Sequence, residues 1–252
     1  MDRDESRNGS DADGPVAVVI GSTNNIGRAV AERLSADGYH AVVTSRHGDE
    51  AEAVAATLPG SGSGFEVDVT EPAAVEALFE HVEATLGRLD VLVNNVAYTA
   101  NESILDCDLE TWERTMDTNL RSYFLCTKHA APLLAAGEGG AVVNVTVSST
   151  RGLAEKFSYM TSKGGVTYLT RAAALDLIDR GIRVNAVGSG LVGTPVGYDE
   201  MHDRPAEIER IPAGHPGDPA DVAGAVSYLV SDDAEYVVGA KLDVDGGLNA
   251  SL

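Results

Sequence analysis

Short apolar runs and longer amphipathic stretches alternate along the chain from Pro15 onward. Unbroken apolar runs of this length indicate strands buried on both faces, as in a parallel sheet. They predict strands at residues 16–20, 41–44, 65–69, 89–93, 141–147, 182–187 and 241–244. The intervening pattern predicts helices at 28–36, 52–58, 110–136 and 219–231. Two further helices are predicted, one that begins after an N-cap at Thr70 and one that contains Tyr159. This alternation predicts an α/β protein, doubly wound, with a seven-stranded parallel sheet flanked by helices.

The first 14 residues, MDRDESRNGSDADG, are charged and rich in Gly, Ser and Asp. Segments of this composition bury too little apolar surface to fold. We therefore expect residues 1–14 to be a disordered acidic tail and residues 15–252 to form a single domain. With 44% hydrophobic residues the chain can bury a sizeable core. The glycine-rich segment 59–64 is expected to be a flexible loop.

The formal net charge is −21, from 18 basic and 39 acidic side chains. Such a surface repels nucleic acid and anionic membranes, so neither is expected as a partner. No apolar run of membrane-spanning length and no apolar signal-peptide core is seen, which predicts a cytoplasmic protein. Cys107 and Cys126 are expected to be reduced thiols. The six histidines lack paired ligand spacing, so no metal is expected.

The acidic surface has two interpretations. In a high-salt cytoplasm a dense acidic surface stays hydrated and screened. The alternative is codon bias in an ordinary soluble acidic protein. Stability that falls on dialysis from molar salt into dilute buffer would support the first interpretation, whereas indifference to salt would support the second.

A glycine-bearing turn, Gly21 to Gly27, joins the first expected strand to the first helix. Strand, turn and helix in this order form a dinucleotide-binding unit, because the helix N-terminus presents N–H groups and a positive dipole end to a pyrophosphate. Asn25 stands where a middle glycine is expected. Asparagine tolerates positive φ better than most residues, so we expect the turn to form. The pattern favours a Rossmann fold.

The second expected strand ends in Ser45-Arg46. In dinucleotide-binding folds an acid near this point binds the ribose hydroxyls, whereas an arginine accommodates a 2′-phosphate. The sequence therefore favours NADP over NAD. The alternative is that Arg46 is a solvated base in a loop.

Tyr159 and Lys163 are four residues apart and share one face if this stretch is helical. A neighbouring ammonium favours phenolate and lowers the tyrosine pKa. Proton donors whose pKa lies near the working pH are effective general acids. The alternative is a tyrosine packed on a lysine stem.

Several segments in order resemble the short-chain dehydrogenase/reductase family over residues 15–249. The subgroup resembled includes 3-oxoacyl-carrier-protein reductases and related sugar and alcohol dehydrogenases. The segments are the Gly21–Gly27 turn, Asp68-Val69, Asn94-Asn95, Thr118-Asn119-Leu120, Ser149, Tyr159 with Lys163, Arg183-Val184-Asn185, Gly190 with Thr194, and Val244-Asp245-Gly246-Gly247. The resemblance implies that residues 15–252 are a Rossmann-type oxidoreductase domain. It implies hydride transfer between a nicotinamide and a carbonyl or secondary-alcohol carbon.

The resemblance implies four catalytic residues. Tyr159 would be the general acid in reduction and the base in oxidation. Lys163 would bind the nicotinamide ribose and depress the Tyr159 pKa. Ser149 would hydrogen-bond the substrate oxygen, and Asn119 would hold a water in a proton relay behind Lys163. Donors fixed beforehand stabilise the charge that the oxygen gains as hydride arrives.

The resemblance also implies a cofactor site for NADP(H), with NAD possible. It would run from the pyrophosphate turn through the 2′-phosphate and adenine to the nicotinamide. Its residues would be Gly21, Ser22, Asn24, Asn25, Ile26 and Gly27, then Ser45 and Arg46, Asp68 and Val69, Asn95, Val96 and Ala97, and finally Tyr159, Lys163, Val192 and Thr194.

Three departures from the family pattern bear on the site. Asn25 and Ala97 replace glycines and add bulk beside the cofactor. Ser149 lies closer to Tyr159 than is usual. Ser149 is still preferred, because its surroundings match the strand-to-loop pattern, whereas Thr146 lies inside the strand and Ser148 should point away. We expect Ser149→Ala to lose most turnover, and Thr146→Ala and Ser148→Ala to keep it.

The sequence thus predicts an NADP(H)-dependent oxidoreductase that reduces a ketone, 3-oxoacyl or polyketide-like, to a secondary alcohol. A sugar, polyol or other secondary-alcohol dehydrogenase is the first alternative. A non-catalytic nucleotide-sensing module is the second, supported by Asn25 and Ala97 alone. Family resemblance implies a homotetramer or homodimer. Tyr198, Met201 and His202 are candidates for specificity, or else part of a surface loop.

Overall fold

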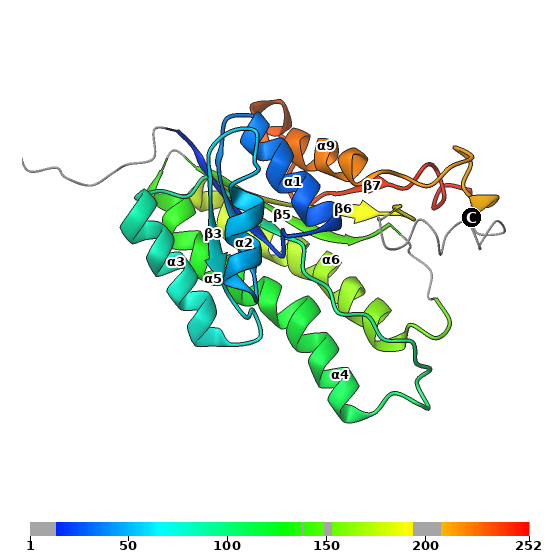
Figure 1. Ribbon diagram of the computed structural model, residues 1–252. Coiled ribbons are helices and arrows are strands. Elements are labelled where there is room, and N and C mark those ends of the chain that lie inside the picture. Colours follow the sequence, from blue (N-terminus) through cyan, green and yellow to red (C-terminus); the bar gives the residue numbers. More distant parts are fainter. Residues whose placement is uncertain (1–13, 138, 149–152, 194–207, 252) are drawn as a thin grey trace, which may run out of the picture.

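The computed structural model describes residues 14–137, 139–148, 153–193 and 208–251. Seven parallel strands form one sheet in the order β3-β2-β1-β4-β5-β6-β7 (Figure 1). They are β1 (Val16–Ile20), β2 (His40–Ser45), β3 (Gly62–Glu66), β4 (Val91–Asn94), β5 (Gly140–Val147), β6 (Ile182–Ser189) and β7 (Lys241–Val244). The doubly wound α/β fold is confirmed. Sequence-based predictions for the tail 1–13, Ser149, Thr194, Tyr198, Met201 and His202 concern residues outside the described ranges.

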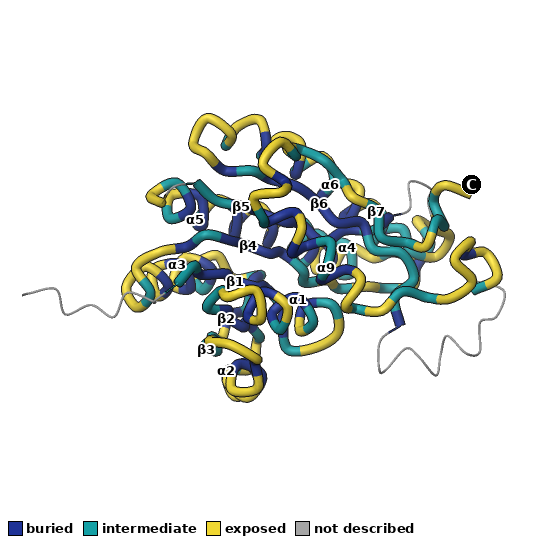
Figure 2. Tube along the Cα trace, turned by 90° about the horizontal axis from the view of Figure 1, so that it is seen from above, coloured by how far each residue is buried: buried dark blue, intermediate teal, exposed yellow. Residues whose placement is uncertain are grey.

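Helices cover both faces of the sheet (Figure 1). On one face, apolar side chains of three helices pack on the strands, namely α1 (Asn25–Ala36), α2 (Gly48–Ala55) and α9 (Pro219–Val230). On the other face the core includes α3 (Pro72–Leu86), α5 (Ser122–Ala136) and α6 (Phe157–Leu177). Alternate residues of β1 face the two cores, as the pleat of a strand requires. Figure 2 shows buried positions concentrated along the central strands and exposed ones on the outer helices.

The chain reverses its direction of winding at β1. This strand pairs with β2 on one side and with β4 on the other, with Ala17 opposite both Ala41 and Val91. Such a reversal is a topological switch point, and ligands of open α/β sheets bind outside the carboxyl ends of strands there. The topology therefore directs attention to the ends of β1, β2 and β4.

Strand β3 corrects the prediction of a strand at 65–69 after a flexible loop. The strand begins within that loop, at Gly62, and pairs with β2 from Ala41 onward. A Cβ on Gly62 would meet the Leu58 side chain, and one on Gly64 would meet the backbone of Glu52. The glycines are thus there because Leu58 and the α2 backbone lie against the strand, not because the segment needs to bend.

The starts of two helices, α2 and α3, also differ from the predictions. Helix α2 begins at Gly48 rather than Glu52. Glu71, not Thr70, is the N-cap of α3, and the Thr70 hydroxyl instead donates to Asp68 Oδ1 at 2.7 Å.

The helix expected over 110–136 is present as three consecutive segments. They are α4 (Leu109–Met116), a π-helical turn at Asp117–Arg121, and α5. Asp108 caps α4 by accepting from Thr111 N at 2.7 Å. The π turn contains the buried Asn119, and single π turns inside helices are frequent at functional sites.

Candidate active site

The turn after β1 has the tight backbone that the sequence predicts. Gly21 has a φ of 72°, and a Cβ there would lie 2.6 Å from Val96 Cγ1. A Cβ on Gly27 would collide with the Gly21 carbonyl oxygen. Asn25 has a φ of 47°, so the prediction that asparagine can adopt the left-handed conformation here is confirmed.

The first turn of α1 is available to an anion. Its N-cap, Asn24, makes no side-chain capping bond within the described structure, and the first turn carries no acid. Asn95 Nδ2 donates to the Gly21 carbonyl at 2.8 Å and so fixes the turn against the end of β4. N–H groups at such a helix start bind phosphates, so these residues fit the pyrophosphate of a dinucleotide.

A cavity of about 610 Å³, the carboxyl-edge cavity, lies beside this turn. Most of the predicted cofactor residues line it. They are Gly21, Asn24, Asn25, Ile26, Ser45, Arg46, Asp68, Val69, Asn95, Val96 and Ala97. Residues that the sequence analysis missed also line it, namely Thr23, Thr44, His47, Glu50, Val67, Thr70, Tyr98, Arg114 and Thr118.

Charged groups gather where the adenosine end of a dinucleotide would lie. Burial alone would raise the pKa of Asp68, but hydrogen bonds from Thr70 and the charge of Arg46 hold it below its usual value. Ser45 Oγ donates to Glu50 Oε2 at 3.3 Å. Glu50 is thus an acid near Arg46 that no sequence motif indicated. Arg114 stacks on the Tyr98 ring, 4.2 Å from its centroid.

Ser22 and Val192 are among the predicted cofactor residues that do not line the cavity, and both have internal partners. Ser22 is fully buried, and its hydroxyl donates to Val19 O at 2.7 Å and accepts from Thr44 N at 2.9 Å. Its side chain therefore ties β1 to β2. Val192 forms a parallel bridge with Gly217 and packs against the core.

Asn119 joins three parts of the site. Its Oδ1 accepts from Tyr98 N at 2.6 Å, while its Nδ2 donates to Tyr98 O at 2.8 Å and to Ser162 Oγ at 3.0 Å. Ser162 Oγ in turn donates to the Tyr159 carbonyl at 2.7 Å. The π turn thus fixes the loop after β4 against α6. The proton-relay role of Asn119 stays a prediction.

Tyr159 and Lys163 lie one turn apart on α6, and burial acts on both. It raises the pKa of Tyr159 and lowers the pKa of the Lys163 ammonium to about 7. The direction at Tyr159 is opposite to the depression that the family resemblance implies. Lys163 Nζ donates to Val145 O at 3.0 Å and to the Tyr123 hydroxyl at 3.2 Å.

The strand that leads to Ser149 is firmly anchored. Thr146 lies within β5, as expected, and its hydroxyl donates to the Lys163 carbonyl at 2.9 Å. Ser148 is buried, and its carbonyl accepts from Lys241 Nζ at 2.8 Å.

Glu102, in the loop before α4, caps the start of α6. Its Oε1 accepts from Ser158 N at 3.0 Å and from Ser158 Oγ at 2.5 Å. The side chain is buried, and its Oε2 has no hydrogen-bond partner among the described residues. Because these residues are 56 positions apart, no local pattern could have revealed this cap.

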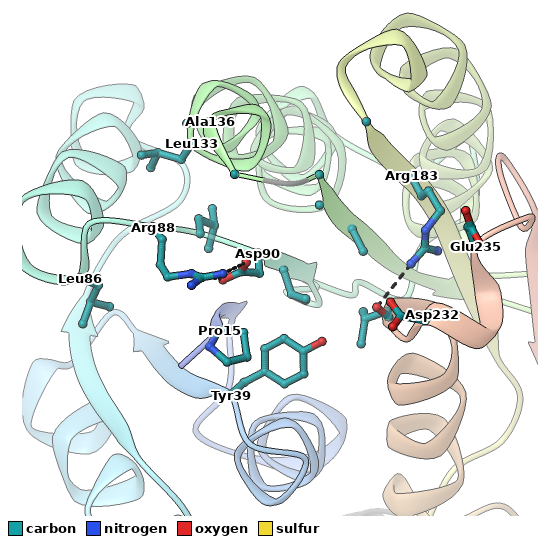
Figure 3. Close-up of a pocket in the computed structure, with 18 of the residues that line it drawn as sticks. Pro15, Tyr39, Leu86, Arg88, Asp90, Leu133, Ala136, Arg183, Asp232 and Glu235 are labelled. Carbon is teal, nitrogen blue, oxygen red and sulfur yellow. Dashed lines mark hydrogen bonds and ion pairs between the residues drawn. The ribbon is translucent and has the colours of Figure 1, made fainter. Parts of the chain in front are cut away.

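A second cavity, of about 1130 Å³, lies at the amino ends of the strands and is called the amino-edge cavity (Figure 3). Tyr39, Arg88, Asp90 and Arg183 line it. Asp90 Oδ2 accepts from Val16 N at 2.7 Å, and Asp90 Oδ1 pairs with Arg88 at 2.7 Å. Within the described ranges no cluster of possible metal ligands occurs, and no helix is long and apolar enough to cross a membrane.

A glycine turn at the switch point of a doubly wound parallel sheet defines a Rossmann-type dinucleotide-binding protein. The family model for enoyl-(acyl carrier protein) reductase matches residues 20–249. The chain therefore belongs to the short-chain dehydrogenase/reductase family and is an NAD(P)-dependent oxidoreductase.

Three curated relatives span almost the whole chain. The 3-oxoacyl-(acyl-carrier-protein) reductase FabG of Haemophilus influenzae is 35% identical over 94% of this chain and 99% of its own length. FabG of Escherichia coli is 32% identical over 94% and 98%. The meso-2,3-butanediol dehydrogenase of Serratia marcescens is 36% identical over 95% and 96%.

Proposed function

We propose that the protein is an NADPH-dependent ketoreductase. The observation that carries the cofactor preference is Arg46, which follows β2 and lines the carboxyl-edge cavity together with the glycine turn. An arginine at this point accommodates a 2′-phosphate. Glu50 acts in the opposite sense, because its carboxylate would repel a phosphate. We propose that the attraction of the Arg46 charge for the 2′-phosphate outweighs the repulsion by Glu50.

The residues of α6 and its neighbours would carry the proton chemistry. The bound cofactor supplies the hydride. The Tyr159 phenol gives its proton to the carbonyl oxygen, while Lys163 binds the ribose hydroxyls and Ser149 holds the substrate oxygen. Asn119 keeps the loop at Tyr98 in place against α6. Thr194 would meet the nicotinamide carboxamide, whereas Val192 is held by its bridge to Gly217.

A 3-oxoacyl thioester is the proposed substrate class, supported by the relatives named for that reaction. The second candidate is a vicinal diol and its hydroxyketone, supported by the butanediol dehydrogenase relative. The proposed setting is the cytoplasm, and the proposed assembly is a homotetramer. Exposed apolar side chains on α5 and α6 support the assembly, among them Phe124, Tyr168 and Leu175.

The first test is a paired fluorescence titration of the protein with NADPH and NADH. Tighter binding of NADPH is expected. Oxidation of NADPH is then followed with acetoacetyl-pantetheine, a 3-oxoacyl thioester, and with acetoin. Faster oxidation with the thioester supports the first substrate class, and faster oxidation with acetoin supports the second. If the protein binds neither nucleotide, the proposal is refuted. The alternative of a nucleotide-sensing module would then also lack support, because neither of these nucleotides would be its ligand.

A further inference from the structure

Tyr123, on α5, is the side chain of this helix that reaches the Lys163 ammonium. It is fully buried, and its hydroxyl oxygen accepts from Lys163 Nζ at 3.2 Å. The same hydroxyl lies 3.0 Å from Val96 O and 3.0 Å from Val145 O. The ammonium also lies 5.1 Å from the centroid of the Tyr123 ring. No sequence motif pointed to this residue, which sits in an apolar helical pattern.

The numbers of donors and acceptors on Lys163 and Tyr123 determine the direction of their hydrogen bonds. A lysine ammonium has three donors and no acceptor. Tyr123 and Val145 accept two of its protons, which leaves one for the site. The single phenol proton goes to Val96 O or Val145 O, so the phenol oxygen is turned toward Lys163 as an acceptor.

Within the described ranges, dipoles and not an opposite charge compensate the Lys163 ammonium. Among the described residues, the titratable groups around it are Tyr123 and Cys126 on α5 and Tyr159 on α6. Burial raises the pKa of each of the three, that of Cys126 to about 12, so all are neutral at pH 7. Each acceptor that remains beside a buried ammonium therefore matters to its charge.

We infer that Tyr123 is a positioning residue for Lys163, holding its ammonium charged and in place through the phenol oxygen. The inference deepens the proposed function, on which it rests. The family resemblance assigns the place behind Lys163 to a relay water held by Asn119. In the described part of the chain the Asn119 side chain bonds Tyr98 and Ser162, and the side chain that accepts from the Lys163 ammonium is Tyr123.

Direct titration of Lys163 tests this without substrate or cofactor. The chain has only four lysines, at 128, 156, 163 and 241, so protein labelled with ¹³C at lysine Cε gives few signals. Lys163→Met identifies the Lys163 signal. Its midpoint is expected near pH 7 in the parent. In Tyr123→Phe it should fall by about one pH unit, because the charged form loses an acceptor.

Thr170→Val is the matched control. Thr170 lies on the same helix as Lys163. The substitution removes its buried hydroxyl, which accepts a hydrogen bond from Asn144 Nδ2 at 3.0 Å. It should lower thermal stability without moving the Lys163 midpoint. Tyr123→Leu should move the midpoint as Tyr123→Phe does.

An unchanged midpoint in both Tyr123 variants would overturn the inference, whatever the protein reduces. Failure to turn over any ketone would instead refute the proposed function and leave the titration result standing. If both hold, the alkaline fall of kcat/KM should move to lower pH in Tyr123→Phe by the same amount as the Lys163 midpoint.

Discussion

The two edges of the sheet each carry a cavity, and the larger one is at the edge without the site. At the amino edge, about 1130 Å³ is bordered by polar groups that bond one another, as Asp90 does with Val16 N and Arg88. Arg183 there donates to the carbonyls of Leu229 and Ser231. At the carboxyl edge, about 610 Å³ is bordered by a glycine turn and a helix start that offer N–H groups to a ligand. The carboxyl-edge cavity therefore differs from the amino-edge cavity by the N–H donors it offers to a ligand and not by its volume.

Two partly buried tyrosines give the widest contrast between the edges. Tyr159→Phe should lower ketone reduction by about 10²–10⁴-fold, because it removes the proposed general acid and leaves packing in place. Tyr39→Phe, in the amino-edge cavity, should leave turnover unchanged. NADPH oxidation with saturating ketone measures both. Equal turnover in Tyr159→Phe and the parent would show that another group donates the proton.

Two cations should respond with opposite signs of stability change. Lys163→Met should raise the free energy of unfolding by about 2–4 kcal/mol at pH 6, since it removes a buried charge. Arg183→Met should lower it, because three carbonyls lose their donor. Urea unfolding measures both variants.

The stability gain in Lys163→Met also depends on pH. The folded pKa of Lys163 is lowered to about 7 from 10.5, so the unfolded chain binds more protons between these values. The parent therefore gains stability as pH rises through this window. The difference between Lys163→Met and the parent should shrink from pH 7 to pH 10.5. A constant difference would mean that Lys163 titrates normally.

Arg46→Ala tests the carboxyl edge alone. Loss of a charge-assisted contact to a 2′-phosphate should weaken NADPH binding by about 10–100-fold and leave NADH binding nearly unchanged. Fluorescence titration with each nucleotide measures this. Arg183→Gln is the control, because it removes an arginine at the amino edge. It should change the affinity for neither NADPH nor NADH. If Arg46→Ala weakens both nucleotides equally, Arg46 does not read the phosphate.

The smallest effect is expected from Asp90→Asn. It keeps the size of the side chain but removes the charge that bonds Val16 N and Arg88. The free energy of unfolding should fall by about 1–2 kcal/mol, with NADPH binding unchanged. Thermal unfolding with and without NADPH provides the measurement. Weaker NADPH binding would mean that the two edges are coupled.

Short-range patterns of the sequence were enough for most of the fold. Apolar runs located six strands closely, since a buried strand needs apolar side chains on both faces. They misplaced β3, where Gly62 makes room for Leu58 and Gly64 for the backbone of α2, because such contacts leave no apolar signature in the strand itself. The asparagine in the turn was predicted correctly, because the requirement for positive φ is local.

The lining of the carboxyl-edge cavity was predictable where residues follow the ends of strands, and not where it depends on contacts between distant residues. The glycine turn and Arg46 lie at fixed offsets from strand ends. Glu50, Arg114 and Tyr98 reach the cavity only through the fold. The same holds for the direction of the Tyr159 pKa, which depends on how deeply α6 is buried.

The cap that Glu102 provides has a consequence for local unfolding. Ser158 directly precedes Tyr159, and its backbone N–H donates to Glu102, which lies in a loop 56 residues earlier. Segments that share such a bond open and close together. Amide hydrogen exchange in the first turn of α6 should therefore follow that of the loop at Glu102, so that Tyr159 is ordered only while a distant stretch of chain is docked.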